Sequence, residues 1–202
     1  MKLVHALILL NLLSVAQWVQ GSQCNCGKPI NKIESFRISH GVAADTERFP
    51  WIVYLEIRLS KGFSLCTSSL LDHRHVLTAA HCILQPEDVS KKPERLSVYV
   101  GNDKTNPMKV ARTYIHKSYK IGGAGSGSDI AVLRLKQSRP DLTPVCLPSN
   151  PWKRYIGHRA VAAGFGVDEN DNLAEKLMKV PVKILSNKQC NIERWWNNNL
   201  KG

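Results

Sequence analysis

Two residues that lie far apart in the sequence have the types and contexts that acid–base catalysis requires. His81 lies in the run TAAHC (78–82), and Asp129 directly precedes the apolar run IAVLRL (130–135). An imidazole acts as a general base toward a hydroxyl nucleophile when a carboxylate fixes its tautomer and orientation. Each residue alone has an ordinary structural interpretation, as a histidine beside a disulfide or as a turn aspartate. Only a folded chain could bring the two together, so the elements around them decide between these interpretations.

The chain from about residue 38 onward reads as a series of short β-strands. Eight strand-like runs rich in Val, Ile, Leu, Tyr and Thr are separated by turn residues, at 51–59, 63–71, 75–80, 95–101, 111–116, 130–135, 158–166 and 177–185. Strands of this length and spacing indicate an all-β sandwich or barrel. Near the end, Ser186 and Gln189 have the spacing of a capping box, which predicts a short helix from about residue 187.

The N-terminus predicts a secretory signal rather than part of this fold. Lys2 supplies a positive end, an apolar run follows, and the small residues near Gly21 suit a signal peptidase. The run has the length of a signal h-region rather than of a membrane span. We therefore expect residues 1–21 to be a signal peptide, the protein to be secreted and extracellular, and no segment to span a membrane; an N-terminal anchor is the alternative. Residues 22–37 are polar and irregular and read as a leader.

Secretion changes the interpretation of the six cysteines. In an oxidising compartment they are expected to form disulfides rather than to bind metal. No Cys-x-x-Cys pair occurs, which argues against a zinc site. The sequence therefore predicts neither a metal site nor a cofactor.

The formal net charge of +12 predicts at most weak binding to acidic surfaces such as glycosaminoglycans or anionic membranes. The basic residues considered for such a role are scattered along the chain, at Lys91–Lys92, Lys117, Lys120, Lys153–Arg154, Lys176 and Lys179. A solvated basic surface is the simpler interpretation. No arginine-rich arm or interleaved aromatic pattern occurs, so the sequence does not favour nucleic-acid binding.

Five motifs occur in an order that carries a family resemblance: RISHGVAADTERFPWIVYL, SLCTSSLLDHRHVLTAAHC, SDIAVLRL, PVCLP and AVAAGFG. Together, from about Cys26 to Gly202, they closely resemble the trypsin-like (chymotrypsin-fold) serine proteases. The resemblance implies an all-β fold of two barrels, with the N-terminal antiparallel barrel complete and the C-terminal barrel only partly present. It also implies a secreted serine endopeptidase zymogen that hydrolyses peptide bonds in protein or peptide substrates by Ser-His-Asp acyl transfer.

The resemblance assigns roles to particular residues. His81 falls on the general base and Asp129 on the carboxylate that orients it. The implied disulfides are Cys66–Cys82, beside the histidine, and Cys26–Cys146, which would tether the leader. Arg37–Ile38 falls on the activation bond, so residues 22–37 would be an activation propeptide that a second protease cuts after Arg37. The protease domain would then be residues 38–202. Some members of the family have a calcium loop with several acidic ligands; the corresponding stretch 101–114 offers only Asp103, so the resemblance implies no calcium site.

The sequence departs from the family pattern near its end. The family's nucleophile lies in a Gly-Asp-Ser-Gly-Gly motif, and no such motif occurs in the 202 residues. Ser126 and Ser128 are poor substitutes, because a residue beside Asp129 would lie behind the imidazole. We therefore expect the domain to be truncated before the nucleophile region, and the chain as given to be inactive. The alternative is a non-catalytic protease homologue that acts as a binding or regulatory protein. The partners of Cys24 and Cys190 stay open.

Overall fold

The computed structural model describes residues 25–29, 42–44, 46–84, 93–101, 103, 105–119, 128–150, 154–166, 174 and 176–191. The predicted signal peptide, the Arg37–Ile38 bond, Cys24 and Ser126 lie outside the described residues. Within them, no helix is long and apolar enough to cross a membrane.

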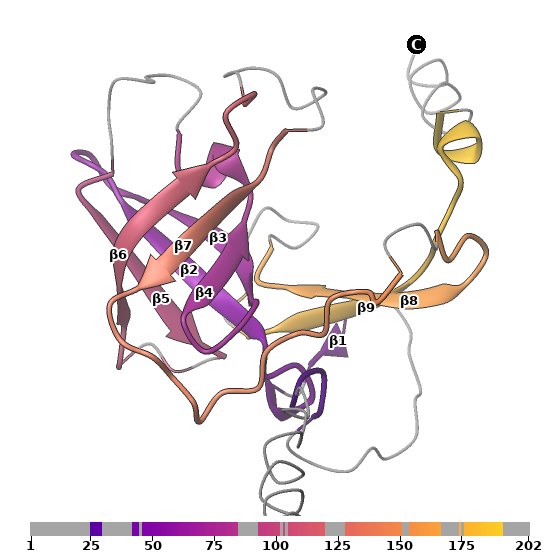
Figure 1. Ribbon diagram of the computed structural model, residues 1–202, viewed down its shortest axis with the longest axis horizontal. Helices are drawn as coiled ribbons and strands as arrows, with labels where there is room; N and C mark the ends of the chain where they lie inside the picture. The colour runs from indigo at the N-terminus through magenta and orange to yellow at the C-terminus, as the bar shows by residue number, and fades with distance from the viewer. Residues whose placement is uncertain are drawn as a thin grey trace, which may run out of the picture.

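Six antiparallel strands close into a barrel in the first part of the chain (Figure 1). They are β2 (Ile52–Arg58), β3 (Phe63–Leu70), β4 (His75–Thr78), β5 (Arg95–Val100), β6 (Met108–Ile115) and β7 (Ala131–Leu135), paired in the order β2-β3-β4-β7-β6-β5. All six were predicted from the sequence, although β6 begins earlier than its predicted run. Closure leaves this barrel without a free strand edge.

The barrel interior is filled by one side chain in every two along each strand. On β7 the inward residues Ala131, Leu133 and Leu135 are fully buried, whereas Val132 and Arg134 between them face outward and are half-buried. The inward positions of the other strands join them in one apolar core that includes Val53, Leu55, Ile57, Leu70, Val76, Val98 and Met108. This alternation is the period-2 pattern of strands with one buried face.

A second, smaller sheet consists of β1 (Val42–Ala43), β9 (Met178–Lys183) and β8 (Arg159–Gly164), in the order β1-β9-β8. The register pairs Ala160 with Val182 and Ala162 with Val180, so these four residues share one face. Val180 and Val182 are 41% and 40% exposed. One complete barrel with a second, partial sheet confirms the predicted fold class.

A cluster of large side chains joins the two parts of the fold. Tyr54 points outward from β2, and its ring packs edge-to-face on that of Phe165 at a centroid distance of 5.4 Å. Ala44, Ile52 and Leu177 complete the buried part of this second core. Burial of apolar surface of this kind is the main favourable contribution to the packing of two such layers.

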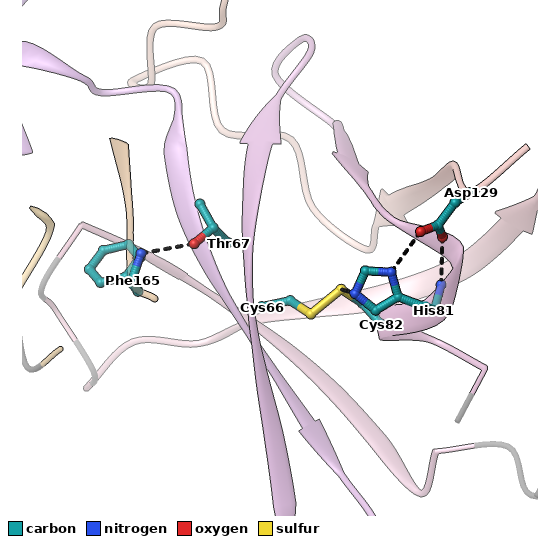
Figure 2. The surroundings of a disulfide bond; sticks show 6 residues. All are labelled: Cys66, Thr67, His81, Cys82, Asp129 and Phe165. Atoms are coloured by element: carbon teal, nitrogen blue, oxygen red, sulfur yellow. Dashed lines mark hydrogen bonds and ion pairs between the residues drawn. A yellow bond between two sulfur atoms is a disulfide. The ribbon is translucent and has the colours of Figure 1, made fainter. Parts of the chain in front are cut away.

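A backbone contact fixes the same junction. The amide of Phe165 donates to the Thr67 hydroxyl at 2.8 Å, which links the end of β8 to β3 (Figure 2). A Cβ on Gly164 would lie 2.8 Å from that same oxygen. The glycine therefore permits an approach that any larger residue would block.

Replacing Gly164 with alanine should destabilise the junction, because Thr67 must move and its bond to Phe165 is strained or lost. We expect a loss of about 1–3 kcal/mol in the free energy of unfolding, as for other overpacking substitutions. The measurement is urea denaturation. Gly166→Ala is the matched control, since a Cβ there meets no atom within 4 Å. Equal effects of the two variants would contradict the packing argument.

The described chain ends in the predicted helical segment, at 187–191. The backbone N–H of Gln189 donates to the Ser186 hydroxyl at 3.2 Å. The backbone N–H of Ser186 donates to the side-chain oxygen of Gln189 at 3.0 Å. This reciprocal pair is the predicted capping box.

Candidate active site

His81 is positioned by a short turn at the end of β4. The 3-10 helix η3 (Ala80–Cys82) follows Thr78 almost directly. Ala80 is fully buried and Cys82 is 6% exposed, so both neighbours of His81 are anchored in the core. The histidine side chain between them is directed outward and is 55% exposed. The sequence TAAHC thus combines buried small residues with one exposed imidazole.

Asp129 reaches the same place from the start of β7, which pairs with β4. One oxygen of its carboxylate, Oδ1, accepts the His81 backbone N–H at 2.9 Å. The other, Oδ2, lies 2.7 Å from Nδ1 of the His81 ring (Figure 2). The structure therefore brings together the two candidate residues that the sequence separates widely, and one carboxylate holds both the backbone and the ring of the histidine.

This arrangement selects one tautomer of the imidazole. A carboxylate only accepts hydrogen bonds, so Nδ1 must carry a hydrogen when it bonds to Asp129. In the neutral ring Nε2 is then unprotonated and can accept a proton from a hydroxyl. Nε2 lies on the far side of the ring from Asp129, 3.6 Å from the Cys82 sulfur. The pair has the geometry of a general base with its orienting group.

The electrostatics agree with that geometry. The side-chain hydrogen bond from His81 holds the pKa of Asp129 below its usual value, against a smaller opposing effect of burial, and the His81 backbone amide lowers it further. A lowered pKa means that the Asp129 carboxylate keeps its negative charge to lower pH and so remains a hydrogen-bond acceptor for His81.

Two disulfides link distant parts of the described chain, and one of them lies beside His81. Cys66 of β3 is bonded to Cys82, which follows His81, so the histidine turn is covalently fixed to the barrel wall (Figure 2). Cys26 is bonded to Cys146, and the Gly27 amide also donates to the Pro144 carbonyl at 2.8 Å. The short described segment 25–29 is therefore held against the chain that leaves the barrel.

The sulfur atoms beside His81 do not make a metal site. Cys66, Cys82 and His81 place ligand-type atoms within 4.8 Å of one another. Metals are bound by thiolates, however, and both sulfurs here are consumed in the disulfide. Asp103 is likewise engaged in its own turn, where it accepts from the Thr105 amide and hydroxyl at 2.8 and 2.6 Å.

Several other residues with polar or ionisable side chains have structural roles. Asp72 accepts the backbone N–H of His75 at 2.7 Å and also contacts its ring, and the His73 ring contacts the Arg139 carbonyl. Ser128, adjacent to Asp129, is 7% exposed. Cys190 has a free, exposed thiol in the part of the chain that the structure describes.

Sequence reasoning missed Tyr119. Burial and the nearby charge of Asp129 both raise the pKa of its phenol, so this ring belongs to the surroundings of the carboxylate. The spacing of Tyr119 did not signal this, because the position depends on a contact between distant residues: the Tyr119 backbone N–H donates to the His116 carbonyl, and the His116 backbone N–H donates to the carbonyl of Ile130, which follows Asp129.

Comparison with known proteins gives one family and a consistent set of relatives. The family profile described as Trypsin matches residues 38–201. Complement C1r-A subcomponent of Mus musculus is 32% identical over 185 residues, covering 84% of this chain and 25% of that protein. Transmembrane protease serine 11G of Rattus norvegicus is 29% identical over 183 residues, covering 87% of this chain and 41% of that protein.

A solved structure of HL collagenase matches with a TM-score of 0.62 at 22% identity, covering 77% of this chain and 67% of that one. At this identity the likeness shows the fold alone. The chain spans between a quarter and about two-fifths of the length of the curated relatives above.

Proposed function

Because this chain belongs to the trypsin family of serine proteases, we propose that it supplies the general base and the orienting carboxylate of a secreted serine endopeptidase. The observation that carries the proposal is the double contact of Asp129 with His81, at 2.9 Å to the backbone amide and 2.7 Å to Nδ1. Asp72 makes a similar double contact with His75, but only three residues away within one turn. Asp129 and His81 are 48 residues apart, so a local turn does not require their contact, whereas a catalytic base depends on such an orienting carboxylate.

In this proposal His81 performs two proton transfers in each half of the reaction. Its Nε2 removes the proton of a serine hydroxyl as the oxygen attacks the substrate carbonyl carbon, which gives a tetrahedral intermediate. The same proton then passes to the leaving amine as the C–N bond breaks and an acyl-enzyme forms. Water then attacks the acyl carbonyl while Nε2 removes its proton. That proton passes to the serine oxygen as the acid is released. Asp129 stays ionised throughout and stabilises the imidazolium.

We assign the nucleophilic serine to sequence outside these residues. The 202 residues contain no Gly-Asp-Ser-Gly-Gly motif. The described serine nearest Asp129 in sequence, Ser128, is 7% exposed, and a residue beside the orienting carboxylate is expected to lie behind the imidazole. The whole protein, and not these residues alone, would therefore be the endopeptidase.

We further propose a secreted zymogen that is activated by cleavage after Arg37, with residues 1–21 as the signal peptide, 22–37 as the propeptide and 38–202 as protease domain. The Cys26–Cys146 disulfide supports this organisation, since it would keep the propeptide attached after cleavage. Disulfides are also typical of proteins exported to an oxidising compartment.

The test is active-site labelling of the full protein from culture medium with a fluorophosphonate probe, after cleavage at Arg37. We expect labelling of the cleaved protein, none for His81→Ala, and none for Arg37→Gln treated with the same activator. His158→Ala is the matched control, since His158 is an exposed histidine remote from Asp129. A folded, cleaved protein that is not labelled would instead support the non-catalytic homologue.

A further inference from the structure

The outward face of three adjacent barrel strands gathers basic residues that the sequence scatters. β4, β7 and β6 lie side by side on one side of the barrel (Figure 1). The register places Arg134 of β7 between His75 of β4 and Arg112 of β6. One row further along, Lys136 donates its amide to the Lys109 carbonyl. We call Lys109, Arg112, Arg134 and Lys136 the basic face.

These side chains point to solvent on a common side. On β7 the alternation that buries Leu133 and Leu135 directs Arg134 outward, and Lys136 continues the same alternation. On β6, a bulge between Val110 and Arg112 shifts the alternation by one residue. Arg112 therefore points outward, opposite Arg134. Lys109, Arg112 and Lys136 are exposed, and Arg134 is half-buried.

The basic face lacks internal neutralisation. Directly opposed residues in an antiparallel pair have Cβ atoms about 5 Å apart, and like charges at that spacing repel. Within the described part of the chain, three other carboxylates have partners that are not members of the basic face: Asp72 contacts the ring of His75, which lies beside Arg134, Asp129 contacts the ring of His81, and Asp141 pairs with Arg139. Glu56 lies two strands beyond Lys109 in the same register. Two opposed pairs of cations are therefore left facing solvent.

We propose that the basic face binds a sulfated polysaccharide. A linear polyanion with closely spaced sulfates would relieve the repulsion within both rows at once, and guanidinium groups hold sulfate-type oxygens in a bidentate manner. The two rows extend across neighbouring strands that are about 4.8 Å apart, which suits a chain laid over the sheet.

A polysaccharide suits this surface better than a nucleic acid. Single-stranded nucleic acids are bound by cations together with a series of aromatic rings on which bases stack. Among the outward-facing residues of β4, β6 and β7, Tyr114 is the one Phe, Tyr or Trp. The two disulfides also indicate an oxidising compartment, where sulfated glycans are the abundant polyanions.

The surface is separate from the candidate active site. His81 and Asp129 lie beyond the Thr78–Ala131 end of the β4–β7 pair, whereas Arg134 lies toward its other end. At the rise of an extended strand, Ala131 and Arg134 are about 10 Å apart. Polysaccharide binding thus does not depend on the proposed catalytic function, and each can fail without the other.

Salt-dependent binding of the full chain to heparin tests the proposal. For Arg112→Gln/Arg134→Gln we expect roughly tenfold weaker binding, because each exposed ion pair contributes up to a factor of about five. The slope of log affinity against log salt concentration should fall by about two, one for each lost contact. Arg112→Lys/Arg134→Lys should retain most of the wild-type slope.

The matched control is Arg159→Gln/Lys183→Gln, which removes an opposed, exposed basic pair from β8 and β9 and changes the net charge equally. It should bind heparin within about twofold of wild type if the site is local. Equal weakening by the two double variants would overturn the proposal in favour of non-specific attraction by net charge. Tighter binding of single-stranded RNA than of heparin would overturn the choice of ligand. Unfolding midpoints of all variants establish that the fold is retained.

Discussion

Asp129→Asn should reduce kcat/KM of the activated protein by about 10⁴-fold while the fold stays intact. The reason follows from the two hydrogen bonds of the Asp129 carboxylate. The His81 backbone N–H can only donate, so the asparagine oxygen must face it and the asparagine NH₂ must face Nδ1. Nδ1 then becomes an acceptor, the hydrogen moves to Nε2, and the ring cannot remove a proton from serine.

The measurement is steady-state kinetics with a peptide substrate, together with the unfolding midpoint. Asp141→Asn is the matched control: Asp141 is also a carboxylate in an ion pair, 2.7 Å from Arg139, but it has no part in the site. We expect that variant to retain wild-type activity. Activity of Asp129→Asn within tenfold of wild type would show that the tautomer of His81 is not set by Asp129.

The second large effect should follow removal of the Cys66–Cys82 disulfide by the double alanine variant. The bond closes a loop with a sequence separation of 16 residues. For a loop of this size the chain-entropy estimate is about 3 kcal/mol of stability. Activity should fall further than stability accounts for, because Cys82 anchors the turn that carries His81.

Denaturant unfolding without reductant gives the stability, and kinetics under conditions where the variant stays folded gives the activity. Cys190→Ala is the control, since that thiol is free and exposed. If the folded double alanine variant and the wild-type protein had equal kcat/KM, the result would show that the disulfide stabilises the barrel but does not position His81.

The strands were predictable because their signal is local. Runs of apolar, strand-favouring residues between turn residues, such as 52–58 and 131–135, stand out without reference to the rest of the chain. β1 was missed, since two residues carry no periodicity and its pairing with β9 is set by distant sequence. The capping box was found for the same reason as the strands: both of its partners lie within four residues.

The site was only partly predictable. Residue types and contexts marked His81 and Asp129 as candidates, but nothing local required them to meet; the resemblance to a known family supplied that expectation. The Thr67–Phe165 bond and the proximity of Tyr119 to Asp129 had no signal in the sequence, because each depends on how separate elements pack. The basic face was also not predicted. Its residues are separated in the sequence, and only the register of the strands places them side by side.

The closed barrel also has a consequence for the order of biosynthesis. Its six strands all lie between Ile52 and Leu135, so the ribosome delivers every one of them before β8 begins at Arg159. Chains that fold in units usually do so from the N-terminus during synthesis. We expect the barrel to close, and Cys66 to meet Cys82, while the second sheet is still being made. Cys146 follows the last barrel strand in the sequence, so the Cys26–Cys146 disulfide that anchors the leader can form only after all six strands have been synthesised.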